Sequence, residues 1–197
     1  GMMGGRGYTI GKNAACVVVD AKELDFGSVS NSDLFLDEEG NLTETSVIGH
    51  LAAGVPGSVS GMWAAHQRFG SMDWEDLLSP AVELANGFEV GKRFLSSLSP
   101  SIIDALLTFP ASAEQFLPRD GQPPLVGDTL RQPDLATTLG RIRDRGPNGF
   151  YKGETADLIV AEMEHGGGII TLQDLAEYEA EWRDPISFTY RGHTVIS

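Results

Sequence analysis

The segment Gly54–Trp63, GVPGSVSGMW, combines glycine, proline and serine in a way that could hold a phosphate or a nucleophile. A dinucleotide fingerprint needs G-x-G-x-x-G, but these glycines, at 54, 57 and 61, are three and four residues apart. A phosphate loop ends in Gly-Lys-Ser/Thr, whereas Met62 follows Gly61 here. A nucleophile elbow needs a central serine, but Gly57–Gly61 has its serines second and fourth. We therefore predict a helix start whose small residues let another element pack closely.

A second glycine-rich stretch, His165–Gly168, resembles the HGGG oxyanion element of some esterases. The G-x-S-x-G sequence that would accompany it occurs nowhere in the chain. A helix C-terminus explains the stretch better, with Gly166 at the C′ position and His165 near the negative end of the dipole. A hydrolase that uses His165 remains an alternative, and it predicts that His165→Ala abolishes an activity.

The sequence predicts no metal site and no cofactor. The four histidines, at 50, 66, 165 and 193, are scattered, and none has a Cys or His at ligand spacing. The acidic turn at Asp37 lacks the alternating pattern of a calcium loop. Carboxylates are too numerous for a general acid and base to be chosen from sequence.

The charge balance restricts the partners. Lys and Arg number 14 and Asp and Glu number 28, so the formal net charge is −14. Such a charge repels phosphate backbones and anionic lipid surfaces, so we expect neither a nucleic-acid nor a membrane partner. Hydrophobic residues make up 41% of the 197 residues, which is enough for a packed core. No apolar run approaches the roughly 18 residues of a transmembrane helix.

Hydrophobic periodicity predicts strands at both ends of the chain. Short apolar runs with β-branched residues alternate with turns over residues 7–36, which indicates a hairpin-like strand pair. Ile186, Phe188 and Tyr190 alternate before Arg191 and Gly192, which indicates a second pair. We expect residues 1–36, 37–182 and 183–197 to be the first strand pair, a helical region and the terminal strand pair of one structural unit.

The helical region is expected to contain five or six short helices. The first has Val59, Met62, Trp63, His66 and Phe69 on one face and ends at Gly70. Ser79-Pro80 and Ser99-Pro100 each predict an N-cap with proline at the first helical position. Residues 109–131 are expected to be a long packed loop. Further helices are marked by Leu135, Leu139 and Ile142, by Ala156, Ile159, Val160 and Met163, and by a capping-box-like start at Thr171–Asp174.

Three blocks of the sequence together resemble the γ-glutamyltransferase (γ-glutamyltranspeptidase, glutathione hydrolase) family of N-terminal-nucleophile hydrolases. They are GHLAAGVPGSVSGMWAAHQRFG (49–70), LLSPAVELANGFEV (77–90) and the stretch from GPNGFYKG to FTYRG (146–192). Residues 4–35 resemble the family more weakly. The resemblance implies an α+β, predominantly helical fragment of an αββα fold with short strand pairs at both ends. It also places the whole chain within the family's large subunit.

The resemblance implies that the catalytic residue lies outside this sequence. Family members cleave themselves and expose a small-subunit threonine that attacks the γ-glutamyl carbonyl. In the large subunit, an arginine after an Asp-Phe or Asp-Gly pair binds the substrate's α-carboxylate. Here Gly27 and Ser28 follow Asp25-Phe26, so the family arginine is absent from this candidate substrate-binding position. Arg6 is the only arginine near it in sequence.

We therefore expect a large-subunit segment that is catalytically inactive alone and begins and ends within one domain. A small-subunit partner or a homo-oligomer would cover its open edges, and only the completed enzyme would bind a γ-glutamyl small molecule. A stand-alone binding or scaffold module derived from the family is the alternative. No leader segment opens the sequence, although members of the family are often periplasmic or extracellular.

Overall fold

The computed structural model describes residues 7–10, 16–21, 35–41 and 43–196. The chain divides into two compact units, which are residues 1–74 with 144–197 (unit 1) and residues 75–143 (unit 2). Each unit has its own buried side chains. The domain limits proposed from the sequence, at 36 and 182, stay a prediction.

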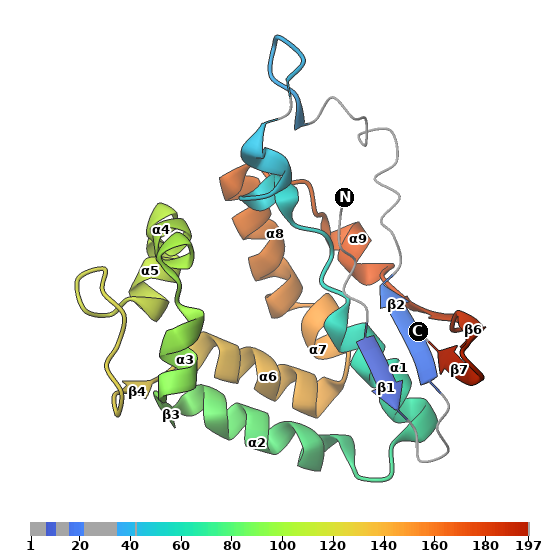
Figure 1. Ribbon diagram of the computed structural model, residues 1–197. Coiled ribbons are helices and arrows are strands. Elements are labelled where there is room, and N and C mark those ends of the chain that lie inside the picture. Colours follow the sequence, from blue (N-terminus) through green and yellow to red (C-terminus); the bar gives the residue numbers. More distant parts are fainter. Residues whose placement is uncertain (1–6, 11–15, 22–34, 42, 197) are drawn as a thin grey trace. The chain divides into compact units, whose positions relative to one another are not determined.

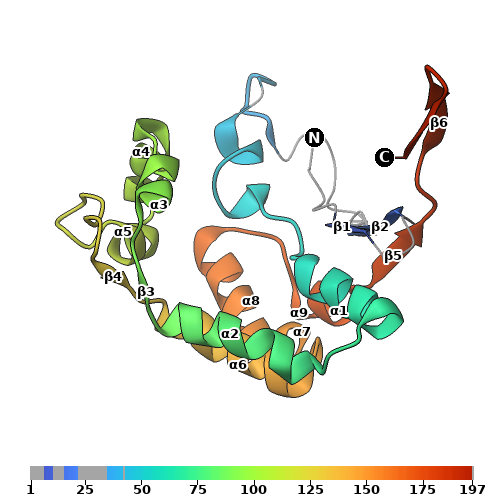
Figure 2. The ribbon, with the colours of Figure 1, turned by 60° about the horizontal axis from the view of Figure 1, so that its bottom comes forward.

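Unit 1 contains a three-stranded antiparallel sheet with the strand order β1-β2-β5. The strands are β1 (Gly7–Ile10), β2 (Cys16–Ala21) and β5 (Ala180–Arg183), and Val19 pairs with both Gly7 and Trp182. Helix α1 (Ser58–Phe69) packs against all three strands, of which β1 and β2 are labelled in Figure 1 and β5 in Figure 2. The strand pair predicted near the N-terminus is confirmed, whereas β5 was missed because its sequence, AEWR, is too short and polar to indicate a strand.

Unit 1 also contains helices outside this sheet. Helices α7 (Asn148–Tyr151), α8 (Glu154–Gly166) and α9 (Leu172–Ala176) contact one another. The 3-10 helices η3 (Glu44–Ser46) and η4 (His50–Ala52) precede α1. The capping box at the start of α9 is present, with Thr171 and Asp174 exchanging side-chain to backbone hydrogen bonds. Among the unit 1 residues whose side chains the structure describes, the buried apolar ones are Val55, Val59, Tyr151, Ala156, Ile170, Leu175 and Tyr178.

Strands β6 (Ser187–Tyr190) and β7 (His193–Ile196) form the predicted strand pair at the C-terminal end. Its alternating apolar residues lie at the surface. Ile186, Phe188 and Tyr190 are 71%, 52% and 58% exposed. Because an isolated two-stranded hairpin is marginally stable in water, this apolar surface is one that burial against another element would stabilise.

Unit 2 is a helical unit closed by a two-residue strand pair. Helix α2 (Trp74–Asn86) belongs to unit 2 except for Trp74, and α6 (Pro133–Arg145) belongs to it except for its last two residues. The two helices run side by side in both ribbon views (Figures 1 and 2). Strands β3 (Phe88–Glu89) and β4 (Thr129–Leu130) pair antiparallel. Helices α3 (Lys92–Ser97), α4 (Pro100–Thr108) and α5 (Pro110–Phe116) lie between these strands in sequence. The buried apolar residues of this unit are Ala85, Val90, Leu117, Leu130, Ala136 and Ile142.

Two expectations for this region were wrong. Pro80 does not begin a helix but lies inside α2, which starts six residues earlier at Trp74. The Ser79 hydroxyl donates to the Glu75 carbonyl oxygen at 2.7 Å, as serine does in helix interiors. Residues 110–116, expected within a loop, form α5, because Pro110 supplies the fixed φ of a first helical position. The Ser99–Pro100 start of α4 is confirmed, since Ser99 caps the Ile102 amide.

The fold class predicted from the sequence is confirmed as α+β, mainly helical, with antiparallel strand pairs at both ends. Among the residues that the structure describes, no helix is long and apolar enough to cross a bilayer.

The net charge of −14 predicts that salt stabilises the fold. Repulsion among the excess carboxylates destabilises the compact state, and ionic strength screens it, since the Debye length falls from about 30 Å at 0.01 M to about 3 Å at 1 M. We expect the Tm, measured by circular dichroism, to rise by several degrees between 0.01 and 0.5 M NaCl. The rise should be smaller in a variant with four exposed glutamates (38, 39, 83 and 164) changed to glutamine. A Tm that is unchanged or lowered by salt would contradict this.

Candidate functional site

The candidate substrate-binding position falls outside the residues that the structure describes. Gly27, Ser28 and Arg6 all lie in segments that are not described. Their role therefore stays a prediction from the family resemblance. The other candidate residues, in Gly54–Trp63 and His165–Gly168, are described, and the structure shows what they contact.

The start of α1 is held by a tyrosine hydroxyl from another helix. Gly57 occupies the N-cap position and has no side chain that could accept a hydrogen bond. Tyr151, the last residue of α7, supplies the acceptor instead, because its Oη accepts from the Ser60 backbone N–H at 3.2 Å. The same hydroxyl donates to the Pro56 carbonyl oxygen at 2.5 Å. Tyr151 thus replaces the Ser, Thr or Asp that ordinarily caps a helix.

The Tyr151 hydroxyl stays protonated across the neutral range. Burial raises the pKa of Tyr151 to about 12, while the hydrogen bond from the Ser60 amide lowers it and the neighbouring Tyr178 hydroxyl raises it. The two tyrosine rings are stacked, with centroids 5.5 Å apart. A protonated hydroxyl is required for donation to Pro56, so the raised pKa preserves this contact.

The Ser60 side chain also serves structure. Its Oγ accepts a hydrogen bond from the backbone N–H of Ala180, the first residue of β5, at 3.1 Å. Both polar groups of Ser60 therefore contact segments that lie more than 90 residues away in sequence. These contacts bear out the prediction that Gly54–Trp63 serves packing.

The stretch His165–Gly168 ends helix α8. Gly167 adopts the left-handed conformation, with φ 73° and ψ 24°, and its N–H donates to the Met163 carbonyl oxygen. The N–H of Gly168 donates to the same oxygen at 2.7 Å. These donors satisfy the helix end and do not form an oxyanion hole. The prediction of a helix C-terminus is correct, but α8 includes Gly166, so the capping glycine is Gly167 and not Gly166.

Gly166 has a second function, which sequence reasoning missed. The imidazole of His50 lies directly against it, so that a Cβ at Gly166 would overlap the ring. The His50 Nε2 lies 2.8 Å from Glu162 Oε1, one turn earlier on α8. Glycine is therefore required here for close approach of η4 to α8. The run of glycines suggested that another element packs closely here, but the sequence does not indicate that His50 is the residue in contact.

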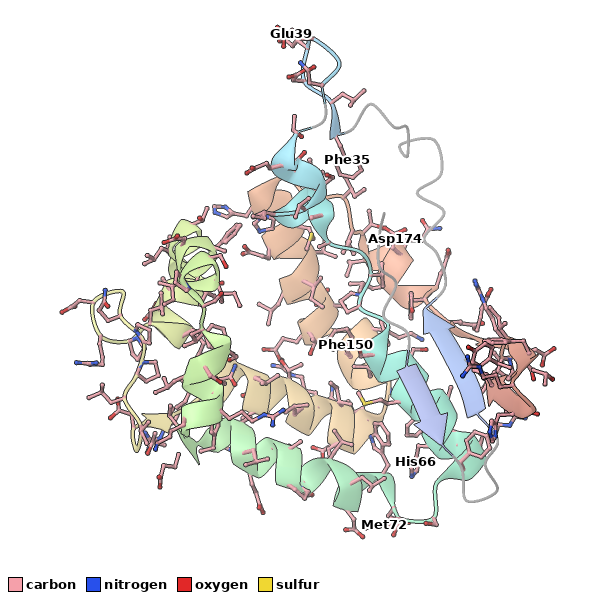
Figure 3. All side chains as sticks on the ribbon, viewed as in Figure 1. Phe35, Glu39, His66, Met72, Phe150 and Asp174 are labelled. Atoms are coloured by element: carbon pink, nitrogen blue, oxygen red, sulfur yellow. The ribbon has the colours of Figure 1, made fainter. Side chains whose placement is uncertain are left out.

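His66 closes the connection between α1 and α2. Its Nε2–H donates to the Met72 carbonyl oxygen at 2.8 Å, and Figure 3 shows both residues at this turn. The rings of Trp63 and Trp74 lie 6.1 and 5.2 Å from the imidazole between centroids. These contacts are those of a packing residue.

Two cavities in the described part of the chain are lined mostly by residues other than the candidates, although Gly168 borders the second. One, of about 620 Å³ in unit 2, is lined by Leu107, Leu117 and residues near them, and its rim carries Glu114 and Asp120. Another, of about 690 Å³ in unit 1, lies between α8 and the start of α9 and includes Glu164 and Asp174. Neither has a histidine in its lining. Within the described ranges, no three His, Cys, Asp or Glu side chains are grouped as metal ligands would be.

Comparison with known proteins identifies the family. The family model described as gamma-glutamyltranspeptidase matches residues 2–197, which is nearly the whole chain. The chain belongs to the γ-glutamyltranspeptidase family.

Similarity to individual members of the γ-glutamyltranspeptidase family supports this assignment. Over its full length the chain is 40% identical to the glutathione hydrolase proenzyme of Pseudomonas aeruginosa and 38% identical to that of Escherichia coli. It superposes on the crystal structure of Helicobacter pylori γ-glutamyltranspeptidase with a TM-score of 0.88 and 37% identity, covering 98% of this chain and 56% of that one. The fold is thus that of an N-terminal-nucleophile hydrolase fragment, as the resemblance implied. The chain spans about a third of the two curated relatives, 35% and 34% of their lengths.

The raised pKa of Tyr151 predicts alkaline destabilisation of this γ-glutamyltranspeptidase segment. The unfolded chain ionises tyrosine near pH 10, but the folded chain does so only near pH 12. The unfolded state therefore releases the proton first, and stability falls as pH rises from 10 to 12, by at most about 3 kcal/mol. Urea unfolding at pH 9 to 12 measures this loss.

Tyr151→Phe should remove this part of the pH dependence. It should also lower stability at pH 8 by about 1–3 kcal/mol, because the Ser60 amide and Pro56 carbonyl lose their partner. Tyr190→Phe, at an exposed tyrosine, is the control. The assignment fails if the two variants unfold alike at every pH.

Gly166→Ala should destabilise the chain by about 1–3 kcal/mol in urea unfolding, because the new methyl group overlaps His50. Alanine is otherwise preferred to glycine in a helix, so Gly140→Ala, in α6 with open space around it, should be neutral or stabilising by up to about 1 kcal/mol. The cost at Gly166 should shrink when His50→Ala is added. Equal effects of the two glycine substitutions would refute the packing role.

Proposed function

We propose that these 197 residues act as a large-subunit segment of a γ-glutamyl hydrolase or transferase. The observation that carries the proposal is the match to the family over residues 2–197, together with relatives named glutathione hydrolase. In the completed enzyme, an N-terminal threonine would attack the γ-glutamyl carbonyl and form an acyl-enzyme, which water or an amine acceptor then resolves. The chain described above would support that site and position the substrate.

The segment is expected to be inactive alone. The family's threonine belongs to the small subunit, and the polar groups best placed for chemistry here are used elsewhere. Ser60 holds Ala180, His50 contacts Glu162, and His66 holds Met72. A partner that supplies the nucleophile is therefore part of the proposal, and a second copy of the chain is the alternative partner. The charge of −14 argues against nucleic acid and anionic membranes.

The family's carboxylate-binding arginine has no counterpart at Gly27, and this favours a second function. A module that had lost its γ-glutamyl ligand would have no need of that arginine. In that case the chain is a non-catalytic binding or scaffold module that keeps the fold alone. The two functions differ in whether the chain can complete an active enzyme.

Two assays separate these functions. The isolated chain should not turn over a chromogenic γ-glutamyl anilide, since it lacks the nucleophile. A chimera in which the chain replaces the matching 200-residue stretch of the Pseudomonas aeruginosa relative should turn over the anilide. Release of the chromophore is followed by absorbance, and the unmodified relative is the positive control.

Steady turnover by the isolated chain would contradict the proposal of an inactive segment. A chimera that folds and matures but does not turn over the anilide would contradict the large-subunit role and favour the scaffold module.

A further inference from the structure

The cavity between α8 and the start of α9 has an apolar lining that reaches the surface. The left-handed Gly167 ends α8, and the segment that follows it lies beside the last turns of that helix. Val160 of α8 and Ile170 of this segment line the cavity together with Leu172, the first residue of α9. Ile170 is buried, whereas Leu172 is 48% exposed. The volume of about 690 Å³ is within the range of ligand pockets, so an apolar side chain can enter from solvent.

Two carboxylates border the same cavity. Glu164 lies one turn after Val160 on the same face of α8, and Asp174 is the third residue of α9. Asp174 Oδ2 accepts hydrogen bonds from the backbone N–H and the hydroxyl of Thr171, at 2.8 and 2.7 Å. Within the described part of the chain, neither Asp174 Oδ1 nor the Glu164 carboxylate has a hydrogen-bond partner. These oxygens are therefore available to a cation.

The acidic character extends beyond the lining of the cavity. Residues 153–182 contain eight Asp and Glu and no Lys or Arg, so this stretch carries more than half of the chain's formal charge of −14. All eight side chains except that of Asp174 are exposed. A concave surface bordered by one sign of charge concentrates the electrostatic potential and attracts the opposite sign. The eight residues are Glu154, Asp157, Glu162, Glu164, Asp174, Glu177, Glu179 and Glu181.

We propose that this cavity is a docking site for a basic segment of a partner protein, which inserts an aliphatic side chain flanked by Lys or Arg. The aliphatic group packs against Val160 and Leu172, and the cations pair with Glu164 and Asp174. The acidic residues outside the lining favour an occupant larger than the cavity, which a protein segment is and a small cation is not. A second copy of the chain, with its own charge of −14, would be repelled. The inference does not depend on the proposed function, because docking requires no catalytic residue.

Binding of a synthetic peptide to the 197-residue chain tests the proposal. The probe is fluorescein-labelled Lys-Arg-Leu-Leu-Arg-Lys, and its fluorescence anisotropy is followed as the protein is added. We expect saturable binding in about 0.05 M NaCl that weakens as salt is raised, since salt screens exposed charges. The peptide Lys-Arg-Gly-Gly-Arg-Lys has the same charge without the aliphatic pair, and it should bind at least about fivefold more weakly.

Two cavity variants and two matched controls locate the interaction. Leu172→Ala removes apolar contact and Glu164→Gln removes a charge, so each should weaken binding of the leucine peptide by about three- to fivefold. Leu158→Ala, at a 59% exposed leucine of α8 outside the lining, should change the Kd by less than about twofold. The same holds for Glu83→Gln, at an exposed glutamate of unit 2. Because Leu172 and Glu164 are exposed, circular dichroism should show that both variants fold like the wild type.

NMR spectra of the backbone amides show where the peptide binds. Its addition should shift the signals of residues 160–174, which contain the lining of the cavity. Absence of saturable binding, shifts confined to other residues, or equal binding of the two peptides would overturn the proposal. Equal weakening in the cavity variants and their controls would also overturn it, since this would indicate attraction to general negative charge. Displacement of the peptide by an equal concentration of spermidine would assign the cavity to a small organic cation and exclude the protein segment.

Discussion

The arrangement of unit 1 depends on the hydroxyl of Tyr151. Helix α1 begins with glycine at its N-cap, so its first amides have no local side chain to accept their hydrogen bonds. The Tyr151 hydroxyl accepts one of them, from Ser60, and also satisfies the Pro56 carbonyl. Because α1 packs against all three strands of the sheet, this one buried group sets where the helix starts and which face it presents. A local cap would fix the start of the helix without fixing its position relative to α7.

Glycine in this chain serves close packing where its sequence context suggested ligand binding. Gly166 admits the ring of His50, and Gly146, with φ 59°, lies against the ring of Trp63. In each case a side chain at the glycine would have to displace a ring held by other contacts. A glycine-rich sequence can therefore indicate either ligand binding or close packing. The spacing of the glycines decides between the two only when it matches no ligand-binding motif, as in Gly54–Trp63.

Elements with strong local signals could be predicted from the sequence. The apolar stripe that begins at Val59 correctly predicted helix α1 and its end at Gly70. Thr171 correctly predicted the capping box of α9. The failures have different physical causes: α5 begins at a local signal, Pro110, that was overlooked, whereas β5 depends on a distant partner strand. Pro80 is accepted within α2, and the strand β5 forms because β2 pairs with it. The roles of Tyr151 and His50 could not be predicted, since their partners are 91 and 112 residues away in sequence. The candidate substrate position came from family resemblance alone.

The hydrogen bonds of the polar groups in this chain bear on how the catalytic work is divided between the large and small subunits in the proposed enzyme. A serine or histidine that already holds a backbone or carboxylate partner can act as a nucleophile or base only by giving up that contact. Leaving a buried partner unsatisfied costs about 1–3 kcal/mol, and the cost recurs at each turnover. Ser60, half-buried with both its amide and its hydroxyl engaged, is in this position. A segment whose hydroxyl groups already make structural hydrogen bonds is suited to holding a site rigid, while the small subunit supplies the nucleophile. This is the division of work that the large-subunit proposal requires.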